Sequence, residues 1–179
     1  GFGRTGSLFA CEQLEIEPDL LCLGKGLTNG YLPLAVTLAS ESLFEAFIGE
    51  HAKTFFHGHT YTANPLGCAA ANACLSLFEE EQTMSSVASL GDTLEKALHR
   101  LSQRADIARI RQKGLMIGID LQSPQGRALD PVLRTGQQVC MEARYHGVIL
   151  RPLGDTVVMM PPLCMSPLQV KQVVAVLEV

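Results

Sequence analysis

Residues 18–39 constrain the fold most, because they hold two short apolar runs with one lysine between them. The first run, PDLLCLGK, is bounded by Pro18 and Gly24, and the second, LPLAVTLAS, follows the polar turn GLTNGY. Short apolar runs bounded by turn residues are typical of strands that are buried on both faces. The sequence therefore predicts two buried strands in a covered sheet, with Lys25 at the end of the first.

Helix signals follow these strands. The segment ASESLFEAF has the spacing of a short helix, with Ser40 or Ser42 as a possible cap. Asn64 followed by Pro65 predicts the start of a second helix, whose small side chains indicate close packing and burial. Three glutamates at 79–81 oppose the dipole at a helix end, so we expect this helix to break there.

The second half of the chain mixes helices and strands. One amphipathic helix is predicted by apolar residues at helical spacing, namely Val87, Leu90, Leu94, Ala97, Leu98 and Leu101. The alternating, β-branched segment IARIRQKGLMIGIDLQ begins near residue 107, and the helical PVLRTGQQVCMEARYHG follows it. VILRPLG and TVVMMPPL predict a strand pair that turns at Gly154 and Asp155, and Ser166 caps a last helix. This order predicts an α/β or α+β class with a lobe boundary near 80–85.

Charge and composition exclude several classes of partner. The net charge is -4, and lysines and arginines stand singly, so we expect no nucleic-acid partner. No apolar run approaches the roughly 20 residues that cross a bilayer, and GFGRTGSLFA lacks the apolar stretch of a signal peptide. Six cysteines without a CxxC pair are typical of a reducing compartment. We expect a soluble, cytoplasmic protein with no membrane partner, and, because the chain opens without Met, a piece of a longer polypeptide.

Lys25 is the first candidate for chemistry, since desolvation disfavours a charged amine at the end of an apolar run. Its long stem can simply reach water. It can instead pair with a phosphate, although LGKGLTNG matches neither a P-loop nor a dinucleotide fingerprint. The third possibility is a Schiff-base lysine, which partial burial makes nucleophilic toward an aldehyde.

The polar loop HGHTYTANP is the second candidate. Hydroxyls and backbone N–H groups beside a helix start can form an anion pocket. A polar loop with a helix cap explains Asn64 and Pro65 equally well. His57 and His59 could suggest a metal site, but no carboxylate or cysteine stands at ligand spacing nearby, so we expect no metal.

Arg151 is the third candidate, in ILRPLG. The proline that follows enforces an extended backbone, which places Arg151 on a strand. It is either a charge at a strand edge or, where it faces a cleft, a guanidinium suited to a substrate carboxylate.

In combination, four motifs resemble the class III, ornithine-aminotransferase-like pyridoxal-phosphate aminotransferases of fold type I. The motifs, in order, are GFGRTGSLFACE, PDLLCLGKGLTNGYLPLAVTL, FFHGHTYTANPLGCAAANA and VILRPLGDTVVMMPPL. The resemblance covers essentially the whole chain. It implies an α/β fold in which residues 1–82 are the carboxy-terminal part of a three-layer α/β/α large domain, and residues 83–179 are a small α+β domain.

The resemblance also implies a role for each candidate residue. Lys25 would hold pyridoxal 5'-phosphate as a Schiff base and later carry a proton, while the glycines beside it leave room for the ring. Thr60 matches the threonine that binds the cofactor phosphate, with His59 lending its backbone. Gly58 matches a position that lines the substrate site, and Arg151 matches the arginine that takes the substrate carboxylate. In this family the loop usually reaches the partner subunit, which implies an obligate homodimer.

The implied reaction is a two-step transamination from a donor amine to a keto acid. FACE, CLGKGLT and FFHGHTYTANPLGCAAA are most similar to the branch in biotin synthesis, whose acceptor is 8-amino-7-oxononanoate and whose donor is S-adenosylmethionine or lysine. Members that use ornithine, 4-aminobutyrate or another ω-amino acid are an alternative, as is a truncated, non-catalytic interaction module. The family's aspartate for the pyridinium nitrogen lies upstream of GFGRTG, so we expect these 179 residues alone to be inactive.

Overall fold

The computed structural model describes residues 1–179, which form two compact units. Unit 1 comprises residues 1–2 and 7–83, and unit 2 comprises residues 3–6 and 84–179. Each unit has an apolar core of its own. No helix in either unit combines the length and the apolar content that a membrane span requires.

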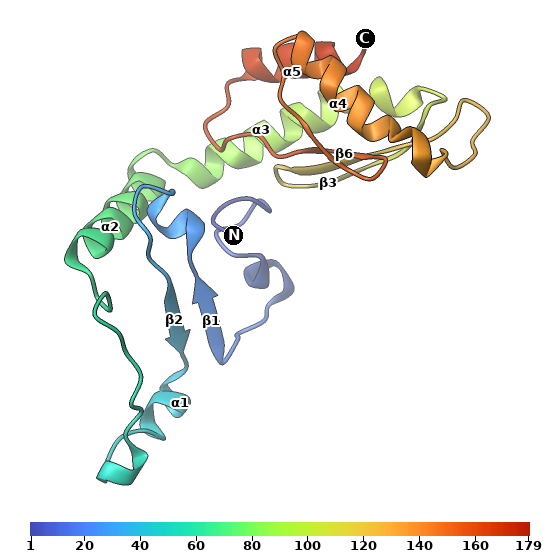
Figure 1. Cartoon of the computed structure of the whole chain (residues 1–179). Coiled ribbons are helices and arrows are strands. Elements are labelled where there is room, and N and C mark those ends of the chain that lie inside the picture. The colour runs from blue at the N-terminus through green and yellow to red at the C-terminus, as the bar shows by residue number, and fades with distance from the viewer. The chain divides into compact units, whose positions relative to one another are not determined.

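Unit 1 contains a two-stranded ribbon and one long helix (Figure 1). Strand β1 (Leu20–Leu23) pairs antiparallel with strand β2 (Val36–Ala39). Helix α2 (Pro65–Glu80) packs against the 3-10 turn η2 (Lys25–Thr28) that follows β1. The shorter elements are η1 (Ala10–Leu14), α1 (Glu41–Glu45) and η3 (His51–Lys53).

The core of unit 1 is small, and its buried apolar members are Phe2, Leu27 and Ala71. The expectation of two buried strands is therefore wrong for this chain. Leu20 is 57% exposed and Leu38 is 52% exposed. The ribbon has no third strand beside it, so both of its edges are unpaired, and only the face that bears Leu23 and Val36 packs on the core.

Helix α2 begins as the sequence predicts. Asn64 Oδ1 accepts hydrogen bonds from the N–H groups of Leu66 (2.9 Å) and Gly67 (3.3 Å), and Pro65 is the first helical residue. The helix ends at Glu80, within the acidic run where a break was expected. The predictions of the cap and of the break are therefore confirmed.

The burial expected for α2 is not found. Only Gly67 and Ala71 of its residues are buried. Gly67 lies against Leu34, because a Cβ at Gly67 would stand 3.5 Å from Leu34 Cδ1. The small side chains thus provide close packing on one face only, and Leu66 and Leu77 elsewhere on the helix stay exposed.

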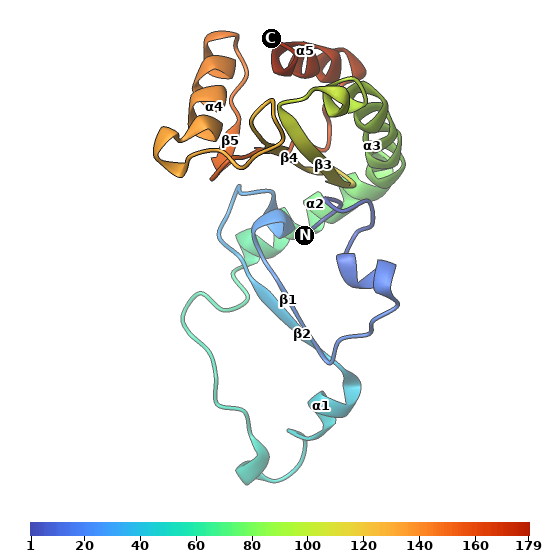
Figure 2. The same cartoon turned by 90° about the vertical axis from the view of Figure 1, so that its right-hand side faces the viewer.

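Unit 2 is a four-stranded antiparallel sheet with helices on one face (Figures 1 and 2). The strand order is β3-β4-β6-β5, with β3 (Ile107–Lys113), β4 (Met116–Leu121), β5 (Arg151–Leu153) and β6 (Thr156–Met159). The helices are α3 (Thr83–Leu98), α4 (Thr135–Tyr145) and α5 (Pro167–Leu177), with 3-10 turns η4 (Leu101–Gln103) and η5 (Pro131–Leu133). The opposite face of the sheet carries no element of unit 2 (Figure 2).

Strand alternation builds the core of unit 2. Ile117 and Ile119 of β4 are buried with the helices, and the residue between them, Gly118, lies on the other face. The predicted apolar stripe of α3 is confirmed, since its buried members include Leu90 and Leu94. The predicted strand pair is confirmed as β5 and β6, which turn at 154–155.

A short amino-terminal segment completes unit 2. The Leu115 N–H donates to the carbonyl of Arg4 at 2.9 Å, which ties residues 3–6 to the turn between β3 and β4. Gly114 in that turn has φ +56, and a Cβ there would lie 2.4 Å from the backbone carbon of Thr5. Only glycine allows this close approach.

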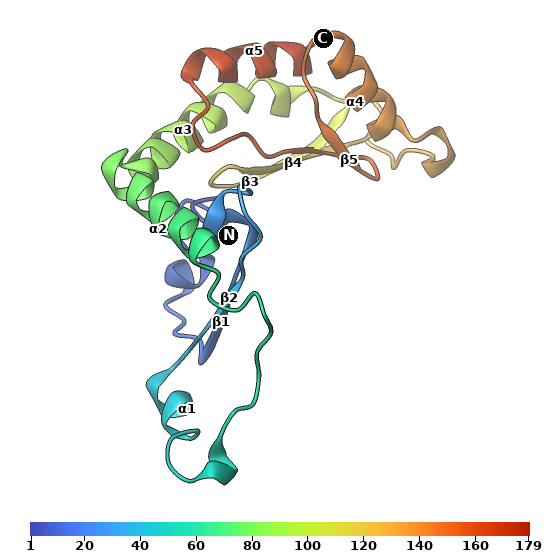
Figure 3. The same ribbon diagram turned by 60° about the vertical axis from the view of Figure 1, so that its left-hand side comes forward.

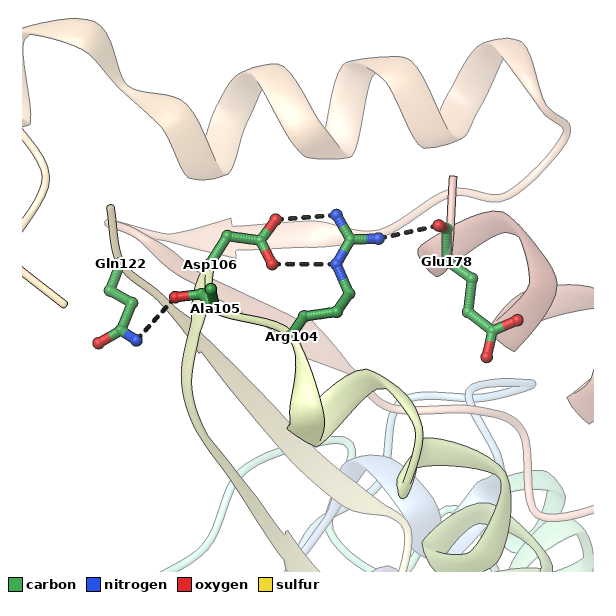
Figure 4. Close-up of polar contacts among 5 residues, drawn as sticks. All are labelled: Arg104, Ala105, Asp106, Gln122 and Glu178. Atoms are coloured by element: carbon green, nitrogen blue, oxygen red, sulfur yellow. Dashed lines mark hydrogen bonds and ion pairs between the residues drawn. The ribbon is translucent and has the colours of Figure 1, made fainter. Parts of the chain in front are cut away.

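The carboxy-terminal end of α5 is tied to the segment before β3 (Figure 4). Arg104 donates from Nε and Nη2 to the carboxylate of Asp106, at 2.9 and 2.8 Å, and from Nη1 to the carbonyl of Glu178 at 2.8 Å. The hydrogen bonds from Arg104 hold the pKa of Asp106 below its ordinary value. At the other end of α5, Ser166 and Gln169 form a capping box, which confirms the predicted start.

All six cysteines are free thiols. Cys140 is buried in unit 2, and burial raises the pKa of its thiol. Cys22 and Cys164 are exposed.

Candidate active site

Lys25 begins the η2 turn, directly after Gly24. Its φ is +51, a left-handed backbone conformation that residues with a Cβ rarely adopt. The turn closes through a hydrogen bond from the Leu27 N–H to the carbonyl of Gly24, at 3.1 Å. Leu27 and Thr28 are buried, and the Thr28 hydroxyl donates to the carbonyl of Leu32. The lysine therefore sits on an anchored turn in an unfavourable backbone conformation.

The side chain of Lys25 is exposed, and it makes no hydrogen bond or ion pair within this chain. Of the three possibilities for Lys25, this chain alone shows the side chain reaching water, and the role as a Schiff-base lysine stays a prediction. The ribbon before it is itself partly in solvent, so the turn that follows β1 has no apolar cover for the lysine side chain within this chain. The amine of Lys25 is therefore accessible to solvent, on a turn whose backbone is anchored.

Gly26 has a packing reason of its own. A Cβ at Gly26 would lie 2.8 Å from Cδ2 of Phe2, whose ring is buried and packs edge-on against Phe9 at 5.2 Å between centroids. At Gly24 a Cβ would meet only ordinary contacts, the nearest at 3.6 Å from Ala35. The packing of Phe2 is thus a reason for glycine at position 26, and the expectation that the two glycines leave room for a ring stays a prediction.

Gly58, His59 and Thr60 lie on one exposed loop, which connects η3 to α2 and turns at residues 60–63, apart from the η2 turn (Figures 1 and 3). The His59 N–H donates to Thr62 Oγ1 at 3.0 Å, and the Tyr61 N–H donates to Nδ1 of His59 at 3.1 Å. The N–H and hydroxyl of Thr60 make no hydrogen bond in this chain. Thr60 thus has open donors, whereas the backbone donor of His59 is occupied.

The start of α2 does not add an anion pocket to this loop. Asn64 Oδ1 takes the N–H groups of Leu66 and Gly67, and its carbonyl takes the Cys68 N–H at 2.9 Å. Pro65 has no N–H to offer. All first-turn donors are therefore satisfied, and the cap explanation of Asn64 and Pro65 is the one that the structure supports.

Arg151 lies in unit 2, on strand β5, and is exposed. It stands opposite Val158 of β6, on the face of the sheet that bears no helices (Figure 2). No carboxylate pairs with its guanidinium in this chain. Lys25 and the loop belong to unit 1, so the structure places the candidates on three separate elements of two units.

The sequence did not single out a charged network on the same sheet face. Asp120 accepts hydrogen bonds from Arg109 Nε (2.5 Å), Arg111 Nη2 (2.7 Å) and Thr156 Oγ1 (2.7 Å). Hydrogen bonds from Arg111, and then from Arg109, hold the pKa of Asp120 well below its usual range. The alternation of β3 and β4 was the available signal, because it puts these three charges on one face.

Two groups of unit 1, on separate elements, have chemistry of their own to offer a ligand. A free amine at Lys25 can add to a carbonyl carbon, and the hydroxyl and N–H of Thr60 can donate to phosphate oxygens. The guanidinium of Arg151 has the fork geometry that binds a carboxylate with two hydrogen bonds.

Comparisons with known proteins agree with this chemistry. The family model "Aminotransferase class-III" matches residues 1–179. The adenosylmethionine-8-amino-7-oxononanoate aminotransferase of Nitratidesulfovibrio vulgaris is 47% identical over 178 residues, which are 97% of this chain and 33% of that protein. The enzyme of the same name from Aquifex aeolicus is 44% identical over 99% of this chain and 40% of its own length.

Two solved structures show the same fold. The crystal structure of adenosylmethionine-8-amino-7-oxononanoate aminotransferase from Methanocaldococcus jannaschii has a TM-score of 0.87 and 34% identity, over 99% of this chain and 43% of that one. An amine transaminase from an uncultivated Pseudomonas species, in its PLP-bound internal aldimine form, has a TM-score of 0.90 and 36% identity, over 99% and 41%. These likenesses confirm the predicted α/β fold of fold type I.

The chain spans about one third to two fifths of the length of these relatives. The assignment of residues 1–82 and 83–179 to a large and a small domain stays a prediction. The family itself is shown by a match along the whole chain. This chain belongs to the class III aminotransferases.

Proposed function

We propose that this chain is part of a pyridoxal-phosphate-dependent aminotransferase that transfers an amino group to 8-amino-7-oxononanoate in biotin biosynthesis. The observation that carries the proposal is the 47% identity, over 97% of the chain, to an enzyme named for that acceptor. Because the chain spans only part of its relatives, the proposal concerns a whole protein of which residues 1–82 form part of the large domain and 83–179 the small domain.

Pyridoxal phosphate, when bound, supplies the electron sink that stabilises negative charge on a substrate carbon. The Lys25 amine would bind the cofactor aldehyde and, once released by substrate, would take and return the proton at that carbon. The open N–H and hydroxyl of Thr60 would donate to the phosphate. His59 would act by shaping the loop through its bonds to Tyr61 and Thr62, since its own N–H is occupied.

The substrate would be held by two further residues. Gly58 would line the substrate site, where the lack of a side chain leaves space. Arg151 would bind the substrate carboxylate with its free guanidinium. S-adenosylmethionine is the favoured donor, because the most similar relatives described above carry it in their names.

A homodimer is part of the proposal. The segment from α1 to the start of α2 leaves large apolar side chains in solvent, namely Phe44, Phe47, Ile48, Phe55 and Phe56. An apolar surface of this kind needs a cover, and the same segment carries Thr60. A second copy that covers it would place the Thr60 loop beside a partner subunit.

A second candidate function is transamination of a simpler amine or ω-amino acid. The amine transaminase of the Pseudomonas species favours it, since its identity of 36% and TM-score of 0.90 match those of the Methanocaldococcus enzyme. Assays of the full-length enzyme with 8-amino-7-oxononanoate and with pyruvate as acceptors separate the two. The proposal expects amino transfer to the first acceptor in preference to the second.

Borohydride reduction with pyridoxal phosphate, followed by peptide mapping, tests the cofactor role in the full-length enzyme. We expect a phosphopyridoxyl group on Lys25. Labels spread evenly over Lys53, Lys96 and Lys171 would contradict the role of Lys25 and would favour a non-catalytic module.

A further inference from the structure

The carbonyl of Gly26, the residue after Lys25, accepts two hydrogen bonds. One comes from the Asn29 N–H at 3.2 Å, within the η2 turn itself. The other comes from Sγ of Cys74 on α2, at 3.4 Å, which links the turn to a residue 48 positions later in the chain. The Cys74 thiol therefore makes the one side-chain hydrogen bond between α2 and the η2 turn, which begins at Lys25.

The opposite constraint on Gly26 is the ring of Phe2. That ring is buried and leaves no room for a Cβ at Gly26. Gly26 is thus held by the Phe2 ring, the Cys74 thiol and the Asn29 N–H. Because Gly26 follows Lys25 directly, these contacts restrain the backbone on the carboxy-terminal side of the lysine. Lys25 itself has φ +51, and its exposed side chain makes no hydrogen bond or ion pair that could hold this conformation.

We infer that Cys74 is a positioning residue for Lys25. Its thiol holds the carbonyl of the Gly26–Leu27 peptide, and by fixing Gly26 it restrains the preceding residue, Lys25, in its left-handed conformation. The inference rests on the proposed role of Lys25 as the lysine that binds the cofactor. Cys74 acts through the backbone and does not touch the cofactor or the substrate in this role.

The test compares three variants of the full-length enzyme by the rate of borohydride labelling with pyridoxal phosphate. Cys74→Ala removes the donor, and Cys74→Ser keeps one. Cys68→Ala is the matched control, because Cys68 lies on the same helix and is equally half-buried, with no hydrogen bond from its side chain. The labelling of Lys25 is measured relative to that of Lys53, Lys96 and Lys171 in the same molecules.

We expect Cys74→Ala to slow the relative labelling of Lys25 about threefold, because a thiol is a weak donor and one such bond holds the turn. Cys74→Ser should restore the wild-type ratio, and Cys68→Ala should leave it unchanged. An unchanged ratio in Cys74→Ala, or an equal loss at all four lysines, overturns the inference. Failure of the wild-type full-length enzyme to label Lys25 overturns the proposed function instead.

Hydrogen exchange in the absence of pyridoxal phosphate gives a second readout. The Asn29 amide shares the carbonyl with the thiol, so its exchange should rise about threefold in Cys74→Ala, with no change in the amides of α3. Circular dichroism shows whether the variant folds. Should Cys74→Ala not fold, Cys74→Val, which fills the space without a donor, is compared with Cys74→Ser, and equal Asn29 exchange in these two also overturns the inference.

Discussion

The two units differ in how far each one buries its own apolar residues. Unit 2 closes a core of fourteen buried residues between its sheet and three helices, whereas unit 1 has three buried apolar residues and leaves most of its aromatic side chains in solvent. Apolar burial is the main favourable term in folding. Unit 2 therefore buries most of its apolar side chains within itself. Unit 1 leaves apolar side chains exposed, where another surface could pack against them.

The charges of the two units differ as well. Unit 1 holds ten Asp and Glu against two lysines, and unit 2 holds eight against twelve Lys and Arg, which together make the 18 acidic and 14 basic residues of the chain. Lys25 is thus one of only two lysines in an acidic unit, while Arg151 belongs to a basic one. A basic unit attracts anions, so its unpaired Arg151 is well placed to collect a carboxylate.

The largest expected effect tests the difference in burial. Leu94→Ala in α3 should lower the free energy of unfolding of unit 2 by about 3 kcal/mol, because Leu94 is 0% exposed and the change leaves a cavity. Leu77→Ala in α2 is the matched change in unit 1, where the leucine is 49% exposed, and it should cost less than about 0.5 kcal/mol. Urea unfolding of both variants measures the two values, and equal losses would contradict the contrast between the units.

The next effect concerns the charged network on the bare sheet face. Asp120→Asn should lower the stability of unit 2 by about 2 kcal/mol at pH 7, because it weakens charge-assisted bonds from Arg109 and Arg111. The pKa of Asp120 is lower in the folded state than in the unfolded state, so its contribution is complete above about pH 4 and is lost as the pH falls.

Denaturation of Asp120→Asn between pH 2 and pH 7 measures this dependence. The variant should lose the part of the acid destabilisation that Asp120 causes, so its curve should approach that of the wild type at low pH. Asp92→Asn, at an exposed position on α3, is the control and should follow the wild type throughout. Parallel curves for wild type and Asp120→Asn would refute the role of this carboxylate.

The third effect tests whether Arg151 of the basic unit 2 binds the substrate carboxylate. Arg151→Lys in the full-length enzyme should raise KM for the keto acid about tenfold, because lysine cannot make the paired hydrogen bonds of the guanidinium fork. Steady-state kinetics measures the change, with Arg144→Lys on α4 as the control. A KM that stays at the wild-type value would remove Arg151 from the substrate site.

The fourth effect concerns the lysine turn of unit 1. Lys25→Gly should be more stable than Lys25→Ala by about 1 kcal/mol, because glycine adopts φ +51 without the clash of a Cβ. At Lys53, whose φ is not positive, the order of the two substitutions should reverse. Hydrogen exchange of the amides in η2 measures the first comparison. The same stability for both Lys25 variants would show that the turn relaxes without cost.

Local signals in the sequence predicted the elements well. The Asn64 cap, the Ser166 capping box and the turn at Gly154 are contacts between near neighbours, so composition at short range was enough to find them. The stripe of α3 was equally visible, because its period matches a helix that does pack on a sheet.

What the sequence could not predict depends on partners distant along the chain. Burial of β1 and α2 was expected from their apolar content, but burial is a property of what lies beside a segment, and in this chain little does. Cys74 and Phe2 both contact Gly26, although one lies near the end and the other near the start of unit 1 in the sequence. No local sequence pattern predicts either contact. The motif around Lys25 predicted a role for its amine, but it did not predict the contacts that fix the backbone of the turn.

The smallest expected effect concerns the ion pair of Arg104 and Asp106 in unit 2, next to the end of α5. Asp106→Asn should lower the stability of unit 2 by about 0.5 kcal/mol, because the side chains of Arg104 and Asp106 are 39% and 41% exposed, and solvent screens their attraction. The pKa of Asp106 is lowered in the folded state, so this contribution is present near neutral pH and is lost as the pH falls below about 4. Added salt should shrink it further, whereas the loss in Leu94→Ala should persist, because apolar burial is not screened. Urea unfolding in 0.05 and 1 M salt measures both variants, and an Asp106 effect that survives high salt would mean that the tie to Glu178, not the ion pair, stabilises the end of α5.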